Sequence, residues 1–119
     1  MAGFQRVAGV GDFSDGLVRV FVVDGVDVAV VWHEGQFYAL TGACPHARYL
    51  FNYTRIKPED RIFCSSHGAW FDLKTGKVLG GPTDRDLCVY AVRVEGEDVC
   101  VSIETSDGAR LVDRPGLRS

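Results

Sequence analysis

The feature that most constrains this chain is a pair of short Cys/His clusters in its middle third. Cys44 and His46 form a Cys-x-His box, and after a gap of 17 residues Cys64 and His67 form a Cys-x-x-His box. The chain has four cysteines and three histidines, so four of these seven residues fall into two short segments. Thiolate and imidazole ligands grouped in this way predict a metal centre, and the fold must bring the two segments together.

Ligand type leaves two classes of metal centre open. Sites built from sulfur and nitrogen ligands suit zinc or iron-sulfur clusters. Zinc sites more often combine a Cys-x-x-Cys box with a separate pair of histidines, whereas each box here mixes one Cys with one His. Mixed boxes suit a [2Fe-2S] cluster whose two irons differ, because each loop can send its Cys to one iron and its His to the other. A zinc-binding structural domain remains the alternative.

Composition excludes several classes of function. The chain has 119 residues, enough for one domain with its own core. A net charge of −3 and a pI near 5.5 argue against nucleic-acid binding and against adsorption to an anionic membrane. Its longest apolar stretch, residues 17–32, is interrupted by charges and is shorter than the roughly 20 apolar residues of a membrane span. Because the N-terminus carries no apolar export segment, we expect a cytoplasmic protein.

Alternating apolar residues and short turns predict an all-β fold. Asp24-Gly25, Glu34-Gly35 and Glu95-Gly96 separate runs of β-forming residues and are typical of hairpin turns. Short strands at this spacing with little helical periodicity favour a sandwich or a small barrel. The strands are expected at residues 18–23, 26–32, 36–40, 61–63, 69–73, 77–79, 88–94 and 98–103.

The sequence around the two boxes resembles the cluster-binding region of Rieske proteins, and most of all the soluble Rieske-type ferredoxins. The residues that carry the resemblance are 44–46, 64–73, 75–78 and 80–82. It implies the Rieske fold, with stacked antiparallel sheets and a small cluster-binding subdomain at one end. In this chain a single domain would span residues 1–104, its subdomain would be inserted at about 41–82, and residues 105–119 would form a polar tail. Residues 48–60 differ from the run often seen after the first box, so the path of that loop is left open.

The resemblance also implies a ligand set for one [2Fe-2S] cluster of the Rieske type. Cys44 and Cys64 would hold the buried iron, and His46 and His67 the iron near the surface. Two neutral imidazoles in place of two thiolates make the site less negative than an all-cysteine site, so its reduction potential is higher.

Rieske clusters have reduction potentials of about −150 to +300 mV. Two departures from the respiratory and photosynthetic Rieske proteins indicate where in this range the potential of this protein is expected. Tyr49 and Ser66 stand where those proteins carry two further, disulfide-bonded cysteines, and Ala69 and Phe71 stand where they carry a serine and a tyrosine whose hydroxyls donate to cluster sulfurs. Without these donors the reduced, more negative cluster is less stabilised. We therefore expect a low potential, on the order of −150 mV.

A Rieske cluster has no open coordination position, so the predicted function is one-electron transfer and not catalysis. The resemblance implies the ferredoxin component of an aromatic-ring-hydroxylating dioxygenase system, active in the catabolism of aromatic hydrocarbons. Such a monomeric carrier takes electrons from a flavin-dependent reductase and delivers them to a terminal oxygenase, docking transiently at the His46 and His67 tip. The small subunit of an assimilatory nitrite reductase is the alternative within the same fold.

The remaining residues of interest have structural interpretations. His33 precedes a predicted turn and is expected at the surface. Cys88 and Cys100 lie in predicted strands and are expected to be reduced and to pack as small hydrophobes. Gly68 allows either close approach to the cluster or a turn with positive φ. One residue of the pair Trp70 and Phe71 is expected in the core, because neighbours on a strand face opposite sides.

Overall fold

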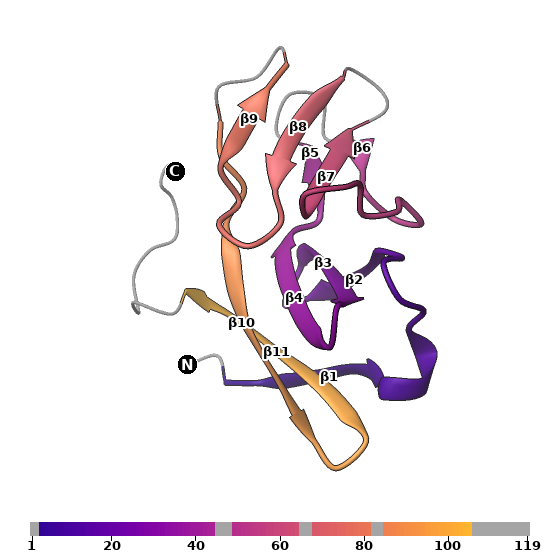
Figure 1. Cartoon of the computed structure of the whole chain (residues 1–119). Coiled ribbons are helices and arrows are strands. Elements are labelled where there is room, and N and C mark those ends of the chain that lie inside the picture. Colours follow the sequence, from indigo (N-terminus) through magenta and orange to yellow (C-terminus); the bar gives the residue numbers. More distant parts are fainter. Residues whose placement is uncertain (1–2, 45–48, 65–67, 82–84, 106–119) are drawn as a thin grey trace.

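The computed structural model describes residues 3–44, 49–64, 68–81 and 85–105, and in these ranges the chain forms eleven strands and one short 3-10 helix. The strands make three antiparallel sheets (Figure 1), which confirms the predicted all-β class. The elements are β1 (Gln5–Gly9), η1 (Val10–Asp12), β2 (Arg19–Val23), β3 (Val26–His33), β4 (Gln36–Thr41), β5 (Ala43–Cys44), β6 (Tyr49–Leu50), β7 (Arg61–Cys64), β8 (Ala69–Asp72), β9 (Val78–Gly80), β10 (Val89–Glu95) and β11 (Asp98–Thr105).

Six strands form the largest sheet, in the order β1-β11-β10-β4-β3-β2, which we call the base sheet. The three predicted hairpins are confirmed within it, two with turns at the predicted residues and the third with its turn one residue later than Glu95-Gly96. Asp24 and Gly25 have φ of 50° and 79° and join β2 to β3, and Glu34 and Gly35 have φ of 51° and 82° and join β3 to β4. Gly96, with φ of 64°, lies in the turn from β10 to β11. In the first two turns φ is positive at both central residues, which gives a turn whose twist matches that of the two strands it joins.

β3 is buried on both of its faces, and this divides the core in two. Val28 and Val30 pack with Val99 and other residues of the base sheet. Ala29 and Val31 point to the opposite face, because side chains alternate along a strand, and they pack in a second apolar cluster. That second cluster, which we call the upper core, consists of Val18, Ala29, Val31, Leu40, Phe51, Ile62, Cys64, Ala69, Phe71, Leu73 and Leu87.

The two smaller sheets lie between β4 and β10 in sequence. β4 and β10 are neighbours in the base sheet, where Leu40 is paired with Val89 and Ala39 with Tyr90. The intervening chain leaves the base sheet after β4 and forms the β5-β6 and β7-β8-β9 sheets at one end of the molecule (Figure 1). The upper core joins them to the base sheet, since it combines residues of β3 and β4 with residues of β7 and β8.

The loop after the first box, whose path the sequence left open, runs back to the base sheet. Phe51 is fully buried in the upper core, and its ring meets that of Phe71 edge to face at 6.0 Å. The side-chain oxygen of Asn52 accepts a hydrogen bond from the backbone N–H of Val20 at 2.9 Å. Backbone bonds from Tyr53 N–H to the Val18 carbonyl and from Val18 N–H to the carbonyl of residue 54 follow, at 2.7 and 2.8 Å. Aromatic and polar residues after the box therefore anchor this loop.

The structure contains strand residues near both ends of the chain that the sequence did not predict. β1, which the hydrophobic pattern did not predict, pairs with β11 from Gln5↔Val101 to Gly9↔Asp98. β11 continues to Thr105, and residues 106–119 of the predicted tail lie outside the described residues.

Cys100 is buried on β11 with a free thiol, as predicted, and Cys88 is half-buried. Within the described ranges no helix has the length and apolar character to cross a membrane.

Candidate metal centre

The two hairpins that carry the Cys/His boxes have the same construction. β5 ends at Cys44, which is paired with Tyr49 of β6, and β7 ends at Cys64, which is paired with Ala69 of β8. Each pair therefore closes a loop of four residues, 45–48 in the first hairpin and 65–68 in the second. His46 and His67 fall in sequence between the paired strands of each hairpin and are outside the described residues. Each box thus has its cysteine at the end of a strand and its histidine in the segment that follows that strand in sequence.

Cys64 is surrounded by apolar side chains. It is 1% exposed, its thiol is free, and it belongs to the upper core together with Ala69, Phe71 and Leu73. Ala69 and Phe71 are completely buried, whereas Trp70 between them is half-buried, which confirms that one residue of the aromatic pair is core. The two positions at which Rieske proteins of high potential carry hydroxyl donors therefore lie on the same buried side of the hairpin as Cys64.

The opposite face of this hairpin is partly exposed and carries a stack of three side chains. Trp70 packs on Phe63 of the neighbouring strand with ring centroids 4.3 Å apart. The guanidinium of Arg61 lies 4.7 Å from the centre of the Trp70 ring. Such a cation-π contact stabilises the hairpin from the solvent side by about 0.5–1 kcal/mol.

Gly68 has the conformation of a turn glycine. Its φ is 78°, and its backbone N–H donates to the carbonyl of Cys64 at 2.8 Å. This amide therefore closes the second loop onto the end of β7. A side chain at this φ is strained, so the structure supports the interpretation of Gly68 as a turn glycine with positive φ.

Gly81 brings a third segment against the second loop. A Cβ atom at this position would lie 2.5 Å from the Cα of Ala69 and 2.7 Å from the carbonyl oxygen of Gly68, and its φ is 106°. Only glycine allows the backbone after β9 to approach the start of β8 so closely. Gly80 beside it has open space around its Cβ position.

Replacing Gly81 with Ala is expected to destabilise the protein by about 2 kcal/mol or more, because a fixed backbone clash adds to the cost of the unusual φ. The expected result is a lower thermal midpoint by circular dichroism and a lower iron content after purification. Gly80→Ala is the matched control, since it adds the same methyl group one residue away into open space. Equal midpoints for the two variants would contradict the close approach.

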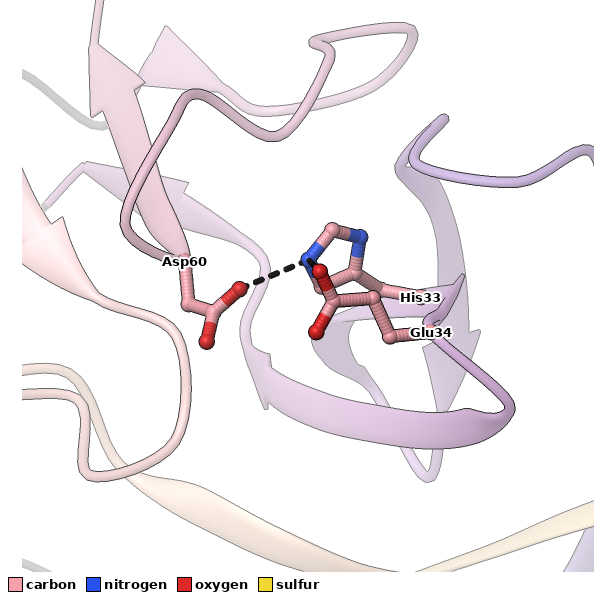
Figure 2. Close-up of side chains that lie close together, drawn as sticks. All are labelled: His33, Glu34 and Asp60. Carbon is pink, nitrogen blue, oxygen red and sulfur yellow. Dashed lines mark hydrogen bonds and ion pairs between the residues drawn. The ribbon is translucent and has the colours of Figure 1, made fainter.

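His33 is not the surface residue that its place beside a turn predicted. Its side chain is only 15% exposed, and its Nε2 atom lies 2.7 Å from Oδ1 of Asp60 (Figure 2). The prediction was wrong because the residue that covers His33 is 27 positions away in sequence, ahead of β7. No local pattern around His33 or Asp60 indicates the pairing.

The described residues fit a thiolate-bound metal group. Cys64 offers a buried thiol at the end of a strand, and Cys44 ends the strand of a hairpin built in the same way. A thiolate in an apolar environment is stabilised when a bound metal ion compensates its negative charge. The apolar upper core beside Cys64 excludes water, which suits an iron-sulfur cluster whose potential depends on the polarity around it.

Comparisons with known proteins agree with this arrangement. The Rieske [2Fe-2S] domain family matches residues 3–104. The biphenyl dioxygenase ferredoxin subunit of Pseudomonas sp. (strain KKS102) is 31% identical over 98 residues, which cover 82% of this chain and 90% of that protein. The ferredoxin component of the alkene monooxygenase system of Xanthobacter autotrophicus is 31% identical over 101 residues, which cover 85% of this chain and 82% of that protein.

Solved structures show the same fold. The ferredoxin of carbazole 1,9a-dioxygenase from Nocardioides aromaticivorans IC177 aligns with a TM-score of 0.76 at 30% identity, over 82% of this chain and 95% of that one. The ferredoxin in a complex of reduced oxygenase and oxidised ferredoxin of carbazole 1,9a-dioxygenase aligns with a TM-score of 0.75 at 28% identity, over 83% and 92%. Nitrite reductase small subunits align at 16–17% identity, which shows the fold alone. The chain therefore belongs to the Rieske [2Fe-2S] family, as a Rieske-type ferredoxin.

Proposed function

We propose that this protein is the one-electron carrier of an aromatic-ring-hydroxylating dioxygenase system, taking electrons from a flavin-dependent reductase and delivering them to a terminal oxygenase. The observation that carries the proposal is the pair of matched hairpins, each with a cysteine at its strand end and a histidine in its loop. Similarity to the biphenyl and carbazole dioxygenase ferredoxins supports the class of system. The solved complex of an oxygenase with a similar ferredoxin supports the oxygenase as a partner.

In this proposal Cys44, Cys64, His46 and His67 hold one Rieske-type [2Fe-2S] cluster. The cluster, when bound, supplies a one-electron couple and no open position for a substrate. The two cysteines bind from the strand ends, where the hairpins fix their backbone. The two histidines bind from the loops. Ala69, Phe71 and Leu73 exclude water from the side on which Cys64 lies.

The apolar surroundings of Cys64 support a low reduction potential. Neither Ala69 nor Phe71 can donate a hydrogen bond to sulfur, and both are buried in the same cluster of residues as Cys64. Donors to sulfur stabilise the reduced cluster, so their absence from these two positions keeps the potential near the lower end of the Rieske range, at about −150 mV.

The docking surface in this proposal is the end of the molecule at which the hairpins present their loops. Leu50, at the end of β6, and Leu79, in β9, are exposed on the two sheets that carry this end. Exposed apolar side chains suit contact with a partner protein. A small apolar contact also suits a carrier that must leave after each transfer, since redox complexes bury little surface.

The proposal extends to three features of the whole molecule. Residues from about 41 to 82 form the cluster-binding subdomain within a single domain. Because β11 includes Thr105, the domain ends one residue later than the predicted 1–104, and the tail is residues 106–119 and not 105–119. The protein acts as a monomer in the cytoplasm, where reducing conditions keep thiols such as that of Cys100 free. Light scattering of the purified protein tests the monomeric state, and fractionation of its native host tests the cytoplasmic location.

An EPR-monitored redox titration of the purified protein tests the proposed carrier function. The expected result is a mixed-ligand [2Fe-2S] signal that appears on reduction at about −150 mV. A midpoint well above zero would refute the low-potential carrier, and a colourless, EPR-silent protein containing zinc would refute electron transfer altogether. Reduction of the purified oxygenase and oxidation of the reductase by this protein then test the two partners.

Replacing His67 with Cys is expected to retain a cluster but to lower its midpoint potential. An anionic thiolate would take the place of a neutral imidazole, which makes the oxidised site one unit more negative and its reduction harder. The shift is expected to be on the order of 100 mV, within the gap between Rieske and all-cysteine clusters. The same EPR titration measures it, and an unchanged midpoint would contradict the assignment of His67 as a ligand.

A further inference from the structure

One carboxylate, that of Asp60, joins the base sheet to both strands of the hairpin that carries Cys64. Its Oδ1 atom lies 2.7 Å from Nε2 of His33, which ends β3 (Figure 2). Its Oδ2 atom lies 3.3 Å from the ammonium of Lys74, which follows β8. Asp60 itself immediately precedes β7. We call these three residues the Asp60 network.

The backbone at Asp60 has an unusual conformation that needs support. Glu59 and Asp60 have φ of 67° and 57°, in the left-handed region that costs energy for residues other than glycine. The carbonyl of Asp60 accepts a hydrogen bond from Leu73 N–H at 2.8 Å. Such a conformation persists only where surrounding contacts offset its energetic cost. The Asp60 network supplies side-chain contacts in addition to this backbone bond.

The charges of the network favour a fixed hydrogen bond. The hydrogen bond from His33 lowers the pKa of Asp60, partial burial opposes this shift, and Lys74 adds to it. An ionised carboxylate only accepts hydrogen bonds, so Nε2 of His33 must carry the hydrogen. The other ring nitrogen, Nδ1, is buried and has no hydrogen-bond partner among the described residues. The ring is therefore held through Nε2.

The same residues do not form a convincing cation site. One ligand atom from each of His33, Glu34 and Asp60 lies within 4.8 Å of the others. However, the ammonium of Lys74 already neutralises Asp60, and a cation bound to Nε2 of His33 would have to displace its hydrogen and the bond to Asp60. The carboxylate of Glu34 is mostly exposed and lies 3.7 Å from Nε2 of His33, which is too long for a hydrogen bond. The geometry is that of a structural link.

Each end of β3 contacts one of the two hairpins of the metal centre. Near its start, the carbonyl of Asp27 accepts a hydrogen bond from Gly42 N–H at 2.9 Å, directly before β5. A Cβ at Gly42 would lie 2.7 Å from the carbonyl carbon of Asp27, so the two backbones are in close contact. At the end of β3, His33 binds Asp60 directly before β7. The first hairpin carries Cys44 and the second carries Cys64.

We propose that His33 is a positioning residue for the metal centre: through Asp60 it anchors the start of β7 to β3, and so sets the second cluster-binding hairpin relative to the first. A cluster that takes one cysteine from each hairpin requires a constant separation between them, and a common support at both ends of one strand provides it. This inference rests on the proposed roles of Cys44 and Cys64 as ligands.

The test compares His33→Leu, which fills the same space without a donor, with His33→Gln, whose side-chain amide can still donate to Asp60. Asp98→Asn is the matched control, because it removes a carboxylate that bonds to Arg6 at 2.7 Å between β1 and β11 of the base sheet. Three quantities are measured on each purified protein: deuterium exchange of the backbone amides of residues 61–64, the linewidth of the reduced EPR signal, and the rate of cluster loss to an iron chelator.

His33→Leu is expected to speed amide exchange and cluster loss about tenfold, the effect of one hydrogen bond to a charged group, and to broaden the EPR signal. His33→Gln and Asp98→Asn are expected to stay within about twofold of the unmodified protein, since both leave a donor facing Asp60. Unchanged exchange and linewidth in His33→Leu would overturn the proposal, and so would a His33→Gln variant that behaves like His33→Leu.

Failure of the proposed function and failure of the His33→Leu variant to fold can each be distinguished from failure of the anchor. If the unmodified protein shows no [2Fe-2S] signal, the proposed function fails, and the exchange of residues 61–64 alone still decides whether His33 anchors β7. If His33→Leu does not fold, Asp60→Ala provides the same comparison, because it removes the oxygen that accepts the hydrogen bond from His33 together with the charge that faces Lys74. Normal exchange in Asp60→Ala would then refute the anchor.

Discussion

Cys64→Ala protein is expected to purify without a [2Fe-2S] cluster. The side chain of Cys64 is 1% exposed and ends the strand that leads into the second box, so no neighbouring cysteine on the same loop can replace it. In the proposed ligand set, loss of this thiolate would leave the inner iron with too few ligands to hold the cluster. We expect iron and acid-labile sulfide to fall at least about tenfold, together with loss of the visible absorption of the cluster.

Cys100→Ala is the matched control for this experiment. Cys100 is also buried and also has a free thiol, but it lies on β11 of the base sheet, opposite Arg6 and Arg93 in the strand register. Its replacement removes a small hydrophobe and leaves the two hairpins unchanged. Full iron content in Cys100→Ala and none in Cys64→Ala is the expected pair of results. A Cys64→Ala protein that retains its cluster would contradict the ligand assignment.

Phe71→Ala is expected to lower the free energy of unfolding by about 3–5 kcal/mol, the usual cost of removing a buried aromatic ring. Phe71 is fully buried and meets the ring of Phe51 edge to face at 6.0 Å, in the upper core that joins the small sheets to the base sheet. The cavity would lie beside Cys64, so cluster retention should fall as well. Denaturant midpoints by circular dichroism and iron content measure the two effects.

Tyr53→Ala is the control for the loss of an aromatic ring as such. Tyr53 is 65% exposed, and the guanidinium of Arg19 lies 5.7 Å from the centre of its ring. An exposed cation-π contact contributes about 0.5–1 kcal/mol, so a small loss of stability is expected. Similar losses in the two variants would show that the upper core collapses around the missing Phe71 ring and does not join the sheets as proposed.

Local sequence was sufficient for the hairpins of the base sheet. Asp24-Gly25 and Glu34-Gly35 take positive φ and join strands whose bounds differ from the predicted ones by one residue. Alternation of side chains also predicted that one of Trp70 and Phe71 would be core. These features depend on residues that are close in sequence, where turn conformation and strand period decide the outcome.

Contacts between distant segments were not predictable in the same way. β1 pairs with β11 across nearly the whole chain, and its short sequence carries no alternation that indicates a partner. Phe51 enters the upper core from a loop whose path the sequence left open. The two-residue strands β5 and β6 are too short for periodicity to reveal. Each of these elements forms because a partner elsewhere completes its hydrogen bonds or covers its apolar surface.

The sequence by itself determined the chemistry of this protein, because Cys44, His46, Cys64 and His67 are rare residue types at spacings that suit few metal centres. It also determined the β class, since turn residues and alternation act locally. Only the tertiary structure decided that β3 supports both hairpins and that His33 lies half-buried against Asp60. Such contacts depend on where the folded backbone places two distant side chains, and neither residue type nor local pattern specifies that position.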